Sequence, residues 1–401
     1  MKKKIAILGS YLPRQCGIAS FTYDLFHSLC KNENDCSVIA VNDENQKYDY
    51  PEEVRYEIDQ NSLESNIRAA TFLNQNQFDV VYVQHEFGIY GGKCGKYIIQ
   101  ILKRLKMPVI STLHTILDEP SGEQAKVIKK IAGYSSKIIV MSEMGKKMLT
   151  EIYGIDLQKI EVIGHGIPDP VSFKYQNYKK NWGIRHKKVM LTFGLLSKSK
   201  GIETVINAMP AIVRKNPNIV YIIVGATHPH VLKSEGESYR EFLKNLVAEN
   251  HLENHVMFID RFVSQNELFE FLQISDIYVI PYLSEKQITS GTLAYAMATH
   301  NAVVSTPFWH AKEALANGKG ILFNWRDSSG LAEIVNNLLN DRLLLRNYKD
   351  KATAYALKFK WKKIGTQYLN LVSKPAIRKI KQYSKIKKDA QFAAIEFKPL
   401  F

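Results

Sequence analysis

The strongest constraint on this chain is a repeated alternation of short apolar runs with longer segments whose apolar residues recur every three or four positions. Short runs of this kind predict β-strands, and the longer periodic segments predict amphipathic helices. In the first half we expect strands at residues 4–10, 36–41, 78–85, 107–114 and 137–142. Strands that alternate with helices form parallel sheets with right-handed crossovers, so the pattern predicts an α/β fold.

The alternation restarts after a polar, basic and aromatic stretch, HGIPDPVSFKYQNYKKNWGIRHKK. Beyond it we expect strands at residues 188–194, 218–226, 255–260, 276–282 and 301–307. Two complete sets of strands and helices indicate two domains, which the length of 401 residues also favours. We expect a Rossmann-like domain over 1–170, a linker over 171–187, a second Rossmann-like domain over 188–360, and a C-terminal helix with a basic tail over 361–401.

The net charge of +15 is concentrated in two segments. Residues 171–188 contain six Lys or Arg and no acidic residue, and residues 374–401 carry a net charge of +6. No nucleic-acid-binding motif accompanies this charge, so we expect no nucleic-acid partner. Two interpretations stay open: solvated basic segments, or a surface that meets anionic lipid or a phosphorylated acceptor. The spacing of Ile377, Ile380, Tyr383 and Ile386 predicts a helix that either packs on the body or docks on a membrane.

The N-terminal run MKKKIAILGSYLPR predicts a first strand rather than a secretory signal, because its apolar part is short and no small-residue cleavage site follows. No stretch approaches the roughly 18 apolar residues of a membrane-spanning helix. The four cysteines form no CxxC pair, which argues against a zinc site or a disulfide framework. We therefore expect a cytoplasmic protein, with peripheral contact at the inner face of the membrane as an alternative.

Ligands of open parallel sheets bind beyond the carboxyl ends of the strands, so site residues should directly follow strands. In the first half, Gly17 lies at the start of a helix and permits close backbone approach to an anion. His85-Glu86 and His114-Thr115 follow neighbouring strands and should face the same ligand. An ordinary turn and structural histidines are the alternative interpretation.

In the second half, the loop Gly194–Gly201 combines glycine, Lys198 and Lys200 immediately before a helix. A lysine beside a helix N-terminus suits a diphosphate, although the GxxxxGK[ST] order of a P-loop is absent. A solvated loop is the alternative. After the strand at 276–282, Thr289, Ser290 and Gly291 open a helix, and their amides would present N–H groups to an anion or a sugar hydroxyl.

In this order and spacing, the residues resemble the motifs of glycosyltransferase family 4, the retaining GT-B enzymes, over nearly the whole chain. Gly194, Lys200 and Gly201 match the family's G-R-x(4)-K-G loop, and Ala296-Met297-Ala298 aligns with the end of its E-G-F-G-L-V-x-x-E-A-M-A loop. Residues 309–313 are similar to its glycine-proline-glutamate loop, and Gly318-Lys319-Gly320 resembles the glycine turn that follows.

Three further likenesses lie in the first half. Gly17-Ile18-Ala19 stands where the family has its glycine-rich loop, His114 matches its strand-end histidine near the donor sugar, and residues 164–168 look like its segment before the hinge.

Three departures indicate a divergent subgroup. Leu195 replaces the family's diphosphate arginine, so Lys198 or Arg261 would have to supply the missing charge. Gln287 and Tyr295 replace both glutamates of the second loop. A glutamine amide still binds sugar hydroxyls, whereas a tyrosine stacks on or hydrogen-bonds a nucleoside without gripping two ribose hydroxyls.

The resemblance implies a GT-B fold, in which two Rossmann-like domains face each other across a cleft and the C-terminal helix crosses back to the N-terminal domain. It implies a retaining glycosyltransferase that moves a hexose of the mannose or glucose type from a UDP- or GDP-linked donor to a saccharide or lipid-linked acceptor in polysaccharide biosynthesis. No Asp-x-Asp motif follows a strand, so we expect no metal and no further cofactor.

The resemblance and the strand-end positions together assign the expected site residues. The catalytic candidates are His114, Lys200 and Glu313. The donor-binding candidates are Gly17, Gly194, Lys198, Lys200, Arg261, Gln287, Ile288, Thr289, Ser290, Gly291, Thr292 and Tyr295. The acceptor-binding candidates are Arg14, His85 and Glu86.

Three other functions stay open from the sequence. A GT-B sugar-nucleotide epimerase would convert the donor without an acceptor, and a retaining phosphorylase would need free phosphate. The missing glutamates also leave room for a non-enzymatic nucleotide-sugar-binding or scaffold protein.

Overall fold

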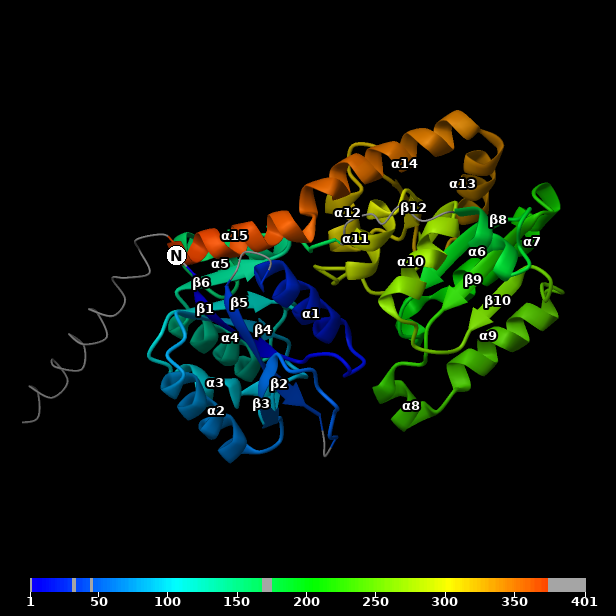
Figure 1. Cartoon of the computed structure of the whole chain (residues 1–401). Helices are drawn as coiled ribbons and strands as arrows, with labels where there is room; N and C mark the ends of the chain where they lie inside the picture. Colours follow the sequence, from blue (N-terminus) through cyan, green and yellow to red (C-terminus); the bar gives the residue numbers. More distant parts are fainter. Residues whose placement is uncertain (1, 31–33, 44–45, 168–174, 374–401) are drawn as a thin grey trace, which may run out of the picture. The chain divides into compact units, whose positions relative to one another are not determined.

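The computed structural model describes residues 2–30, 34–43, 46–167 and 175–373, which form two compact units, each built on its own parallel sheet (Figure 1). Of the described residues, those within Met1–Val140 and Lys146–Ile163 and those from Lys362 to Ser373 form the first unit, and those within Met141–Gly145 and Gly164–Trp361 form the second. No helix in the described part of the chain is long and apolar enough to span a membrane.

The first unit contains a seven-stranded sheet in the order β3-β2-β1-β4-β5-β6-β7, and all its neighbours pair in parallel. The strands are β1 (Lys4–Gly9), β2 (Asp35–Asn42), β3 (Val54–Asp59), β4 (Val80–His85), β5 (Val109–Leu113), β6 (Lys137–Val140) and β7 (Ile160–Val162). Every residue of β4 is buried, as its continuous apolar run predicts for a central strand. The expected parallel α/β fold is confirmed, and the strand order reverses between β1 and β4, where ligands of such sheets bind.

Helices cover both faces of this sheet. They are α1 (Gly17–Cys30), α2 (Leu63–Gln75), α3 (Ile98–Leu102), α4 (Gly122–Tyr134) and α5 (Glu143–Glu151). Figure 1 shows α2, α3 and α4 on one face and α1 on the other.

The second unit contains a six-stranded parallel sheet in the order β10-β9-β8-β11-β12-β13. The strands are β8 (Lys188–Phe193), β9 (Ile219–Val224), β10 (Val256–Ile259), β11 (Ile277–Ile280), β12 (Ala302–Ser305) and β13 (Ile321–Leu322). Alternate residues enter two apolar cores: Val220 and Ile222 of β9 face one, and Tyr221 and Ile223 face the other. Successive side chains of a strand point to opposite faces, so helices pack on both sides.

Helices cover the two apolar faces of the second sheet. They are α6 (Tyr175–Asn181), α7 (Ile202–Lys215), α8 (Pro229–Glu235), α9 (Ser238–Glu249), α10 (Gln265–Ile274), α11 (Gly291–Ala298), α12 (Trp309–Ala314), α13 (Ser328–Asn340) and α14 (Arg342–Ala356).

Part of the predicted linker belongs to the second unit. Helix α6 begins inside the expected range of 171–187, and the Trp182 ring after it packs on Phe271 at 4.9 Å between centroids. The aromatic residues of this basic stretch are therefore drawn into the second unit's packing, which differs from the expected linker. Residues 171–174 lie outside the described residues.

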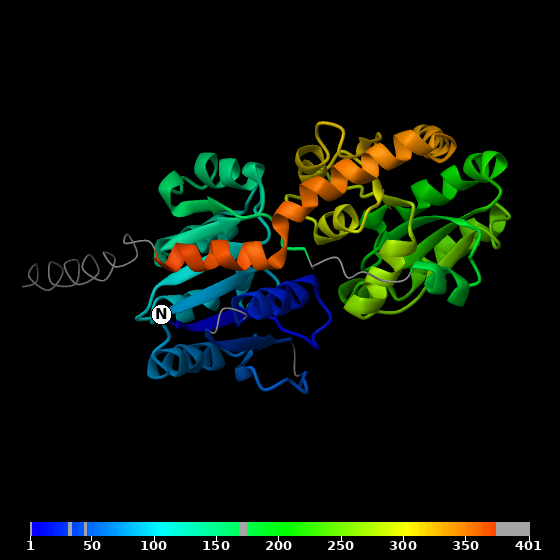
Figure 2. The same ribbon diagram turned by 45° about the horizontal axis from the view of Figure 1, so that its top comes forward.

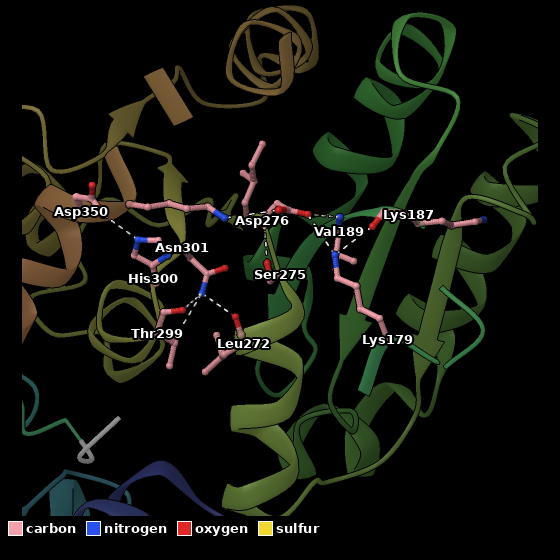
Figure 3. Close-up of polar contacts among 12 residues, drawn as sticks. Lys179, Lys187, Val189, Leu272, Ser275, Asp276, Thr299, His300, Asn301 and Asp350 are labelled. Atoms are coloured by element: carbon pink, nitrogen blue, oxygen red, sulfur yellow. Dashed lines mark hydrogen bonds and ion pairs between the residues drawn. The ribbon is translucent and has the colours of Figure 1, made fainter. Parts of the chain in front are cut away.

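Asp276 links this basic stretch to the sheet through ion pairs and a hydrogen bond (Figure 3). Its carboxylate lies 3.5 Å from the Lys349 ammonium and 3.6 Å from that of Lys179, and it accepts the Val189 N–H at 3.0 Å. Burial alone would raise the pKa of Asp276, but the two lysines and the N–H outweigh it and hold the pKa below its usual range. The network lies where β11 begins, at the amino-terminal ends of the strands, whereas the expected site lies at their carboxyl ends. We therefore assign the network a structural role.

The C-terminal helix α15 (Trp361–Ser373) returns to the first unit, as expected of the GT-B fold (Figure 2). The Tyr82 hydroxyl donates to the Tyr368 carbonyl at 2.7 Å, and the Tyr368 hydroxyl lies 3.0 Å from Thr112 Oγ1. A Cβ on Gly365 would lie 2.1 Å from Ser28 Oγ, so α15 and α1 meet at a glycine. The predicted basic tail over 374–401, with its spaced isoleucines, lies outside the described residues.

Candidate functional site

The loop Gly194–Gly201 lies at the carboxyl end of β8 and leads into α7. Gly201 has a φ of 62°, and a Cβ there would lie 2.2 Å from the Pro281 carbonyl oxygen. Only glycine tolerates both the left-handed backbone and this approach. Leu283 N–H also donates to the Ser199 carbonyl at 2.9 Å. The loop is therefore held against the segment that follows β11, and its role in a ligand site stays a prediction.

The three cations expected near a diphosphate have different partners. Lys198 Nζ pairs with Glu235 at 2.6 Å, and Arg261 donates to Glu267 at 2.8 Å. Lys200 Nζ instead lies 3.9 Å from the centroid of the Tyr282 ring. Exposed ion pairs contribute little energy, so a ligand phosphate can compete for the first two cations, whereas Lys200 has no carboxylate partner in the described part of the chain.

The turn at 287–291 is built from internal hydrogen bonds. Gln287 Nε2 donates to the Thr289 carbonyl at 2.9 Å, and Ser290 Oγ caps α11 by accepting the Leu293 N–H at 3.3 Å. The Ser290 N–H donates to His310 Nδ1 at 2.9 Å, so this amide is already bonded within the chain, and its predicted contact with a ligand stays a prediction. The Thr289 hydroxyl oxygen is buried and has no hydrogen-bond partner within the described ranges.

Two histidines lie behind this turn that were not among the expected site residues. His165 Nδ1 lies 2.7 Å from the Gly166 carbonyl, and a Cβ on Gly291 would meet His165 Nε2 at 2.9 Å. Burial lowers the pKa of His165 to about 4, and burial together with the neighbouring His165 lowers the pKa of His310 to about 4. Both rings are therefore neutral near pH 7. Both lie in runs that resemble family segments, 164–168 and 309–313, but their contacts with the turn arise only in the folded chain.

Helix α12 holds the loop that precedes the turn. Trp309 N–H donates to the Glu285 carbonyl and His310 N–H to the Gln287 carbonyl, both at 3.1 Å, and Lys312 pairs with the Glu285 carboxylate at 2.7 Å. The adjacent Glu313 accepts the Glu143 N–H at 3.1 Å, so one carboxylate oxygen of this catalytic candidate is already bonded.

Two donor-binding candidates are buried in the second unit. Tyr295 is 8% exposed and packs on His165 and Phe269, with ring centroids 5.7 and 5.6 Å away. Ile288 is 3% exposed. The predicted contact of Tyr295 with a nucleoside stays a prediction, and its ring in this structure serves the packing behind α11.

His85 ends β4, and Glu86 and His114 directly follow β4 and β5, whereas the prediction that they face one ligand stays a prediction. His114 Nε2 lies 3.0 Å from Gln84 Oε1, and Thr115 Oγ1 donates to Glu86 Oε2 at 2.6 Å. Burial raises the pKa of Glu86 although its carboxylate accepts hydrogen bonds from the Thr115 hydroxyl and the Phe87 N–H. His85 is fully buried, neither ring nitrogen has a partner in the described part of the chain, and burial lowers its pKa to about 3.

The remaining first-unit candidates lie at the loop after β1. The Arg14 guanidinium donates to the Val41 carbonyl at 2.8 Å and lies 3.7 Å from Asp43. Gly17 opens α1, and a Cβ there would meet nothing within 4 Å, so the space beside it is open. Across residues 2–30, 34–43, 46–167 and 175–373, no group of three or more His, Cys, Asp or Glu side chains is placed to hold a metal ion.

Two family models match the chain. Residues 174–355 match the model described as glycosyl transferases group 1, and residues 16–169 match that described as Glycosyltransferase Family 4. An uncharacterized glycosyltransferase of Methanocaldococcus jannaschii is 24% identical over 92% of this chain and 97% of its own length. A phosphatidyl-myo-inositol mannosyltransferase of Mycolicibacterium smegmatis is 22% identical over 75% of this chain and 72% of its own length.

Solved structures give the same picture of the fold. HepE of Anabaena in complex with UDP has a TM-score of 0.75 at 19% identity, over 92% of this chain and 99% of that chain. The same protein in complex with UDP-glucose has a TM-score of 0.74 at 18% identity, over 92% and 99%. A sucrose-phosphate synthase of Thermosynechococcus elongatus has a TM-score of 0.72 at 16% identity, over 92% and 98%.

Proposed function

The chain belongs to glycosyltransferase family 4 and has the GT-B fold, and on this premise we propose that it transfers a hexose from a UDP- or GDP-linked donor to a saccharide or lipid-linked acceptor. We further propose that the transfer retains the anomeric configuration and needs no metal ion. One observation supports the donor assignment most strongly. The loop Gly194–Gly201, which contains Lys200, contacts the segment that follows β11 at the carboxyl ends of the strands of the second sheet.

The chemistry of this edge supports a diphosphate ligand. Lys200 supplies a positive charge without a carboxylate partner among the described residues, and the first turn of α11 supplies N–H groups that a helix leaves without intrahelical acceptors. Breaking the bond to the sugar leaves negative charge on the departing diphosphate, which a preplaced cation and N–H groups stabilise. HepE was crystallised with UDP and with UDP-glucose, which favours a uridine donor here.

The other candidates keep the roles that the resemblance to the family gives them. We assign His114 to orient the donor sugar and Glu313 to hold sugar hydroxyls through its second carboxylate oxygen. Arg14 and Glu86 are assigned to the acceptor, whereas His85, the third acceptor candidate, is fully buried and is given no contact with it. We also propose a cytoplasmic location, in keeping with the four free cysteines, because thiols stay reduced in that compartment.

The first experiment is a thermal-shift screen of the whole protein with UDP, GDP, ADP and their sugars. A ligand that binds only the folded state raises the melting temperature by mass action, so a UDP or GDP hit identifies the donor class. The hit is then incubated with and without an acceptor panel, in the presence of EDTA, and the anomer of the product is read by NMR. Conversion of the donor without an acceptor would instead favour an epimerase, and an inverted product would overturn retention.

Lys200→Ala tests the diphosphate assignment. The variant loses the charge that faces the phosphates, so we expect nucleotide affinity to fall by about tenfold or more, as for other charge-assisted contacts. Lys198→Ala is the matched control, because its ammonium is already paired with Glu235 and should matter less. Equal losses in the two variants would show that the loop attracts nucleotide only through its net charge.

A further inference from the structure

The Lys200 ammonium lies over the aromatic ring of Tyr282. The ammonium lies 3.9 Å from the ring centroid, well within the range of a cation–π contact. Pro281 and Leu283 bring the two segments together, since Gly201 approaches the Pro281 carbonyl and Leu283 N–H bonds to Ser199.

The ring itself is held firmly. Tyr282 is 3% exposed and stacks on the buried Phe308 ring at 5.5 Å between centroids. Its carbonyl accepts the Thr306 hydroxyl at 2.7 Å. Because packing and the hydrogen bond of its own backbone hold the Tyr282 ring in place, the flexible Lys200 side chain has a fixed surface to contact.

The hydroxyl of Tyr282 reaches the second part of the site. It lies 3.1 Å from Thr292 Oγ1, which lies 3.0 Å from Ser290 Oγ, the cap of α11. One side chain therefore contacts both the lysine of the first loop and the first turn of the helix after the second loop.

We propose that Tyr282 is a positioning residue, which aims the Lys200 ammonium at the donor diphosphate and fixes its distance from the first turn of α11. The inference rests on the proposed function. An aromatic face attracts an ammonium without supplying a counter-charge, so the Lys200 ammonium is available to the ligand, whereas Lys198 and Arg261 would first have to leave the carboxylates of Glu235 and Glu267. Leu195 stands where the resembling family has a second cation, which makes the placement of Lys200 more critical in this chain.

The test is a double-mutant cycle on the full chain, with UDP and GDP binding measured by calorimetry. Tyr282→Leu removes the ring and should weaken binding about fivefold, whereas Tyr282→Phe keeps the ring and should stay within about twofold of the wild type. In the Lys200→Ala background, Tyr282→Leu should have no further effect, because the lysine it places is gone. The same loss of affinity in both backgrounds would overturn the proposal.

Tyr221→Leu is the matched control for lost packing. Tyr221 is fully buried on β9 of the same sheet, and its hydroxyl bonds to Thr192 rather than to any residue of the two loops. It should lower the melting temperature about as much as Tyr282→Leu and leave nucleotide affinity unchanged. A comparable loss of affinity in Tyr221→Leu would show that destabilisation, and not the position of Lys200, explains the effect.

A spectroscopic measurement separates the inference from the proposed function. In the nucleotide-free protein, the ring current of Tyr282 should shift the ε-CH₂ NMR signal of Lys200 upfield, and the shift should vanish in Tyr282→Leu and persist in Tyr282→Phe. Nucleotide binding without the shift or the coupling would overturn the positioning role alone. A protein that shows the shift but binds none of UDP, GDP or ADP would overturn the proposed function, and the positioning role with it.

Discussion

Acidification should destabilise the first unit through His85. This side chain is fully buried at the end of β4, stacks on Tyr90 with centroids 6.1 Å apart, and has no hydrogen-bond partner on either nitrogen in the described ranges. Burial lowers its pKa to about 3, whereas an unfolded histidine has a pKa of about 6.5. Between these values the unfolded chain binds a proton that the folded chain refuses, so the free energy of unfolding falls as the pH falls.

The size of this effect follows from the difference between the two pKa values. Each pH unit between about 6.5 and 3 removes about 1.4 kcal/mol, so lowering the pH from about 7 to 5 should cost about 2 kcal/mol through His85 alone. His85→Leu removes the titrating ring and nearly preserves its volume. The loss of stability between these two pH values should therefore be about 2 kcal/mol smaller in the variant than in the wild type.

Hydrogen exchange of the β4 amides, corrected for intrinsic rates, measures this difference in the first unit. Tryptophan fluorescence during urea unfolding supplies the internal control, because Trp182, Trp309, Trp325 and Trp361 all lie in the second unit. The same pH dependence of β4 in wild type and variant would refute the reasoning. It would mean that His85 takes up its proton in the folded protein.

Three further substitutions test other parts of the structure. Gly201→Ala should lower the free energy of unfolding by at least about 2 kcal/mol, seen by tryptophan fluorescence, because its Cβ would collide with a carbonyl in a left-handed backbone; an unchanged midpoint would refute the close approach. Asp276→Asn should cost about 3 kcal/mol in the same assay because it leaves the buried Lys349 without its counter-charge, and a loss below about 0.5 kcal/mol would place the pair in solvent. His114→Ala should reduce kcat more than it weakens UDP binding, and unchanged kinetics would give His114 a structural role, to which its contacts with Gln84 and Phe21 contribute.

The two edge strands of the first sheet, β3 and β7, lack a clear signal in the sequence. Strand β3 (Val54–Asp59) reads VRYEID and exposes alternate charged residues, and β7 (Ile160–Val162) is only three residues long. Neither has the continuous apolar run of a central strand such as β4, so neither was predicted. The central strands of both units were recognisable because burial on both faces requires uninterrupted apolar residues.

The sequence by itself determined the two parallel α/β units, the returning C-terminal helix and the strand-end loops where a ligand can bind. These follow from local periodicity, from residue types that suit helix starts and close backbone approach, and from the order of motifs along the chain. Tertiary structure alone decided the partners of the site residues: Lys198 with Glu235, Lys200 with Tyr282, and Ser290 with His310. The physical reason is that each contact joins residues from different elements, and only the packing of those elements settles which cation stays available and which amide is already bonded.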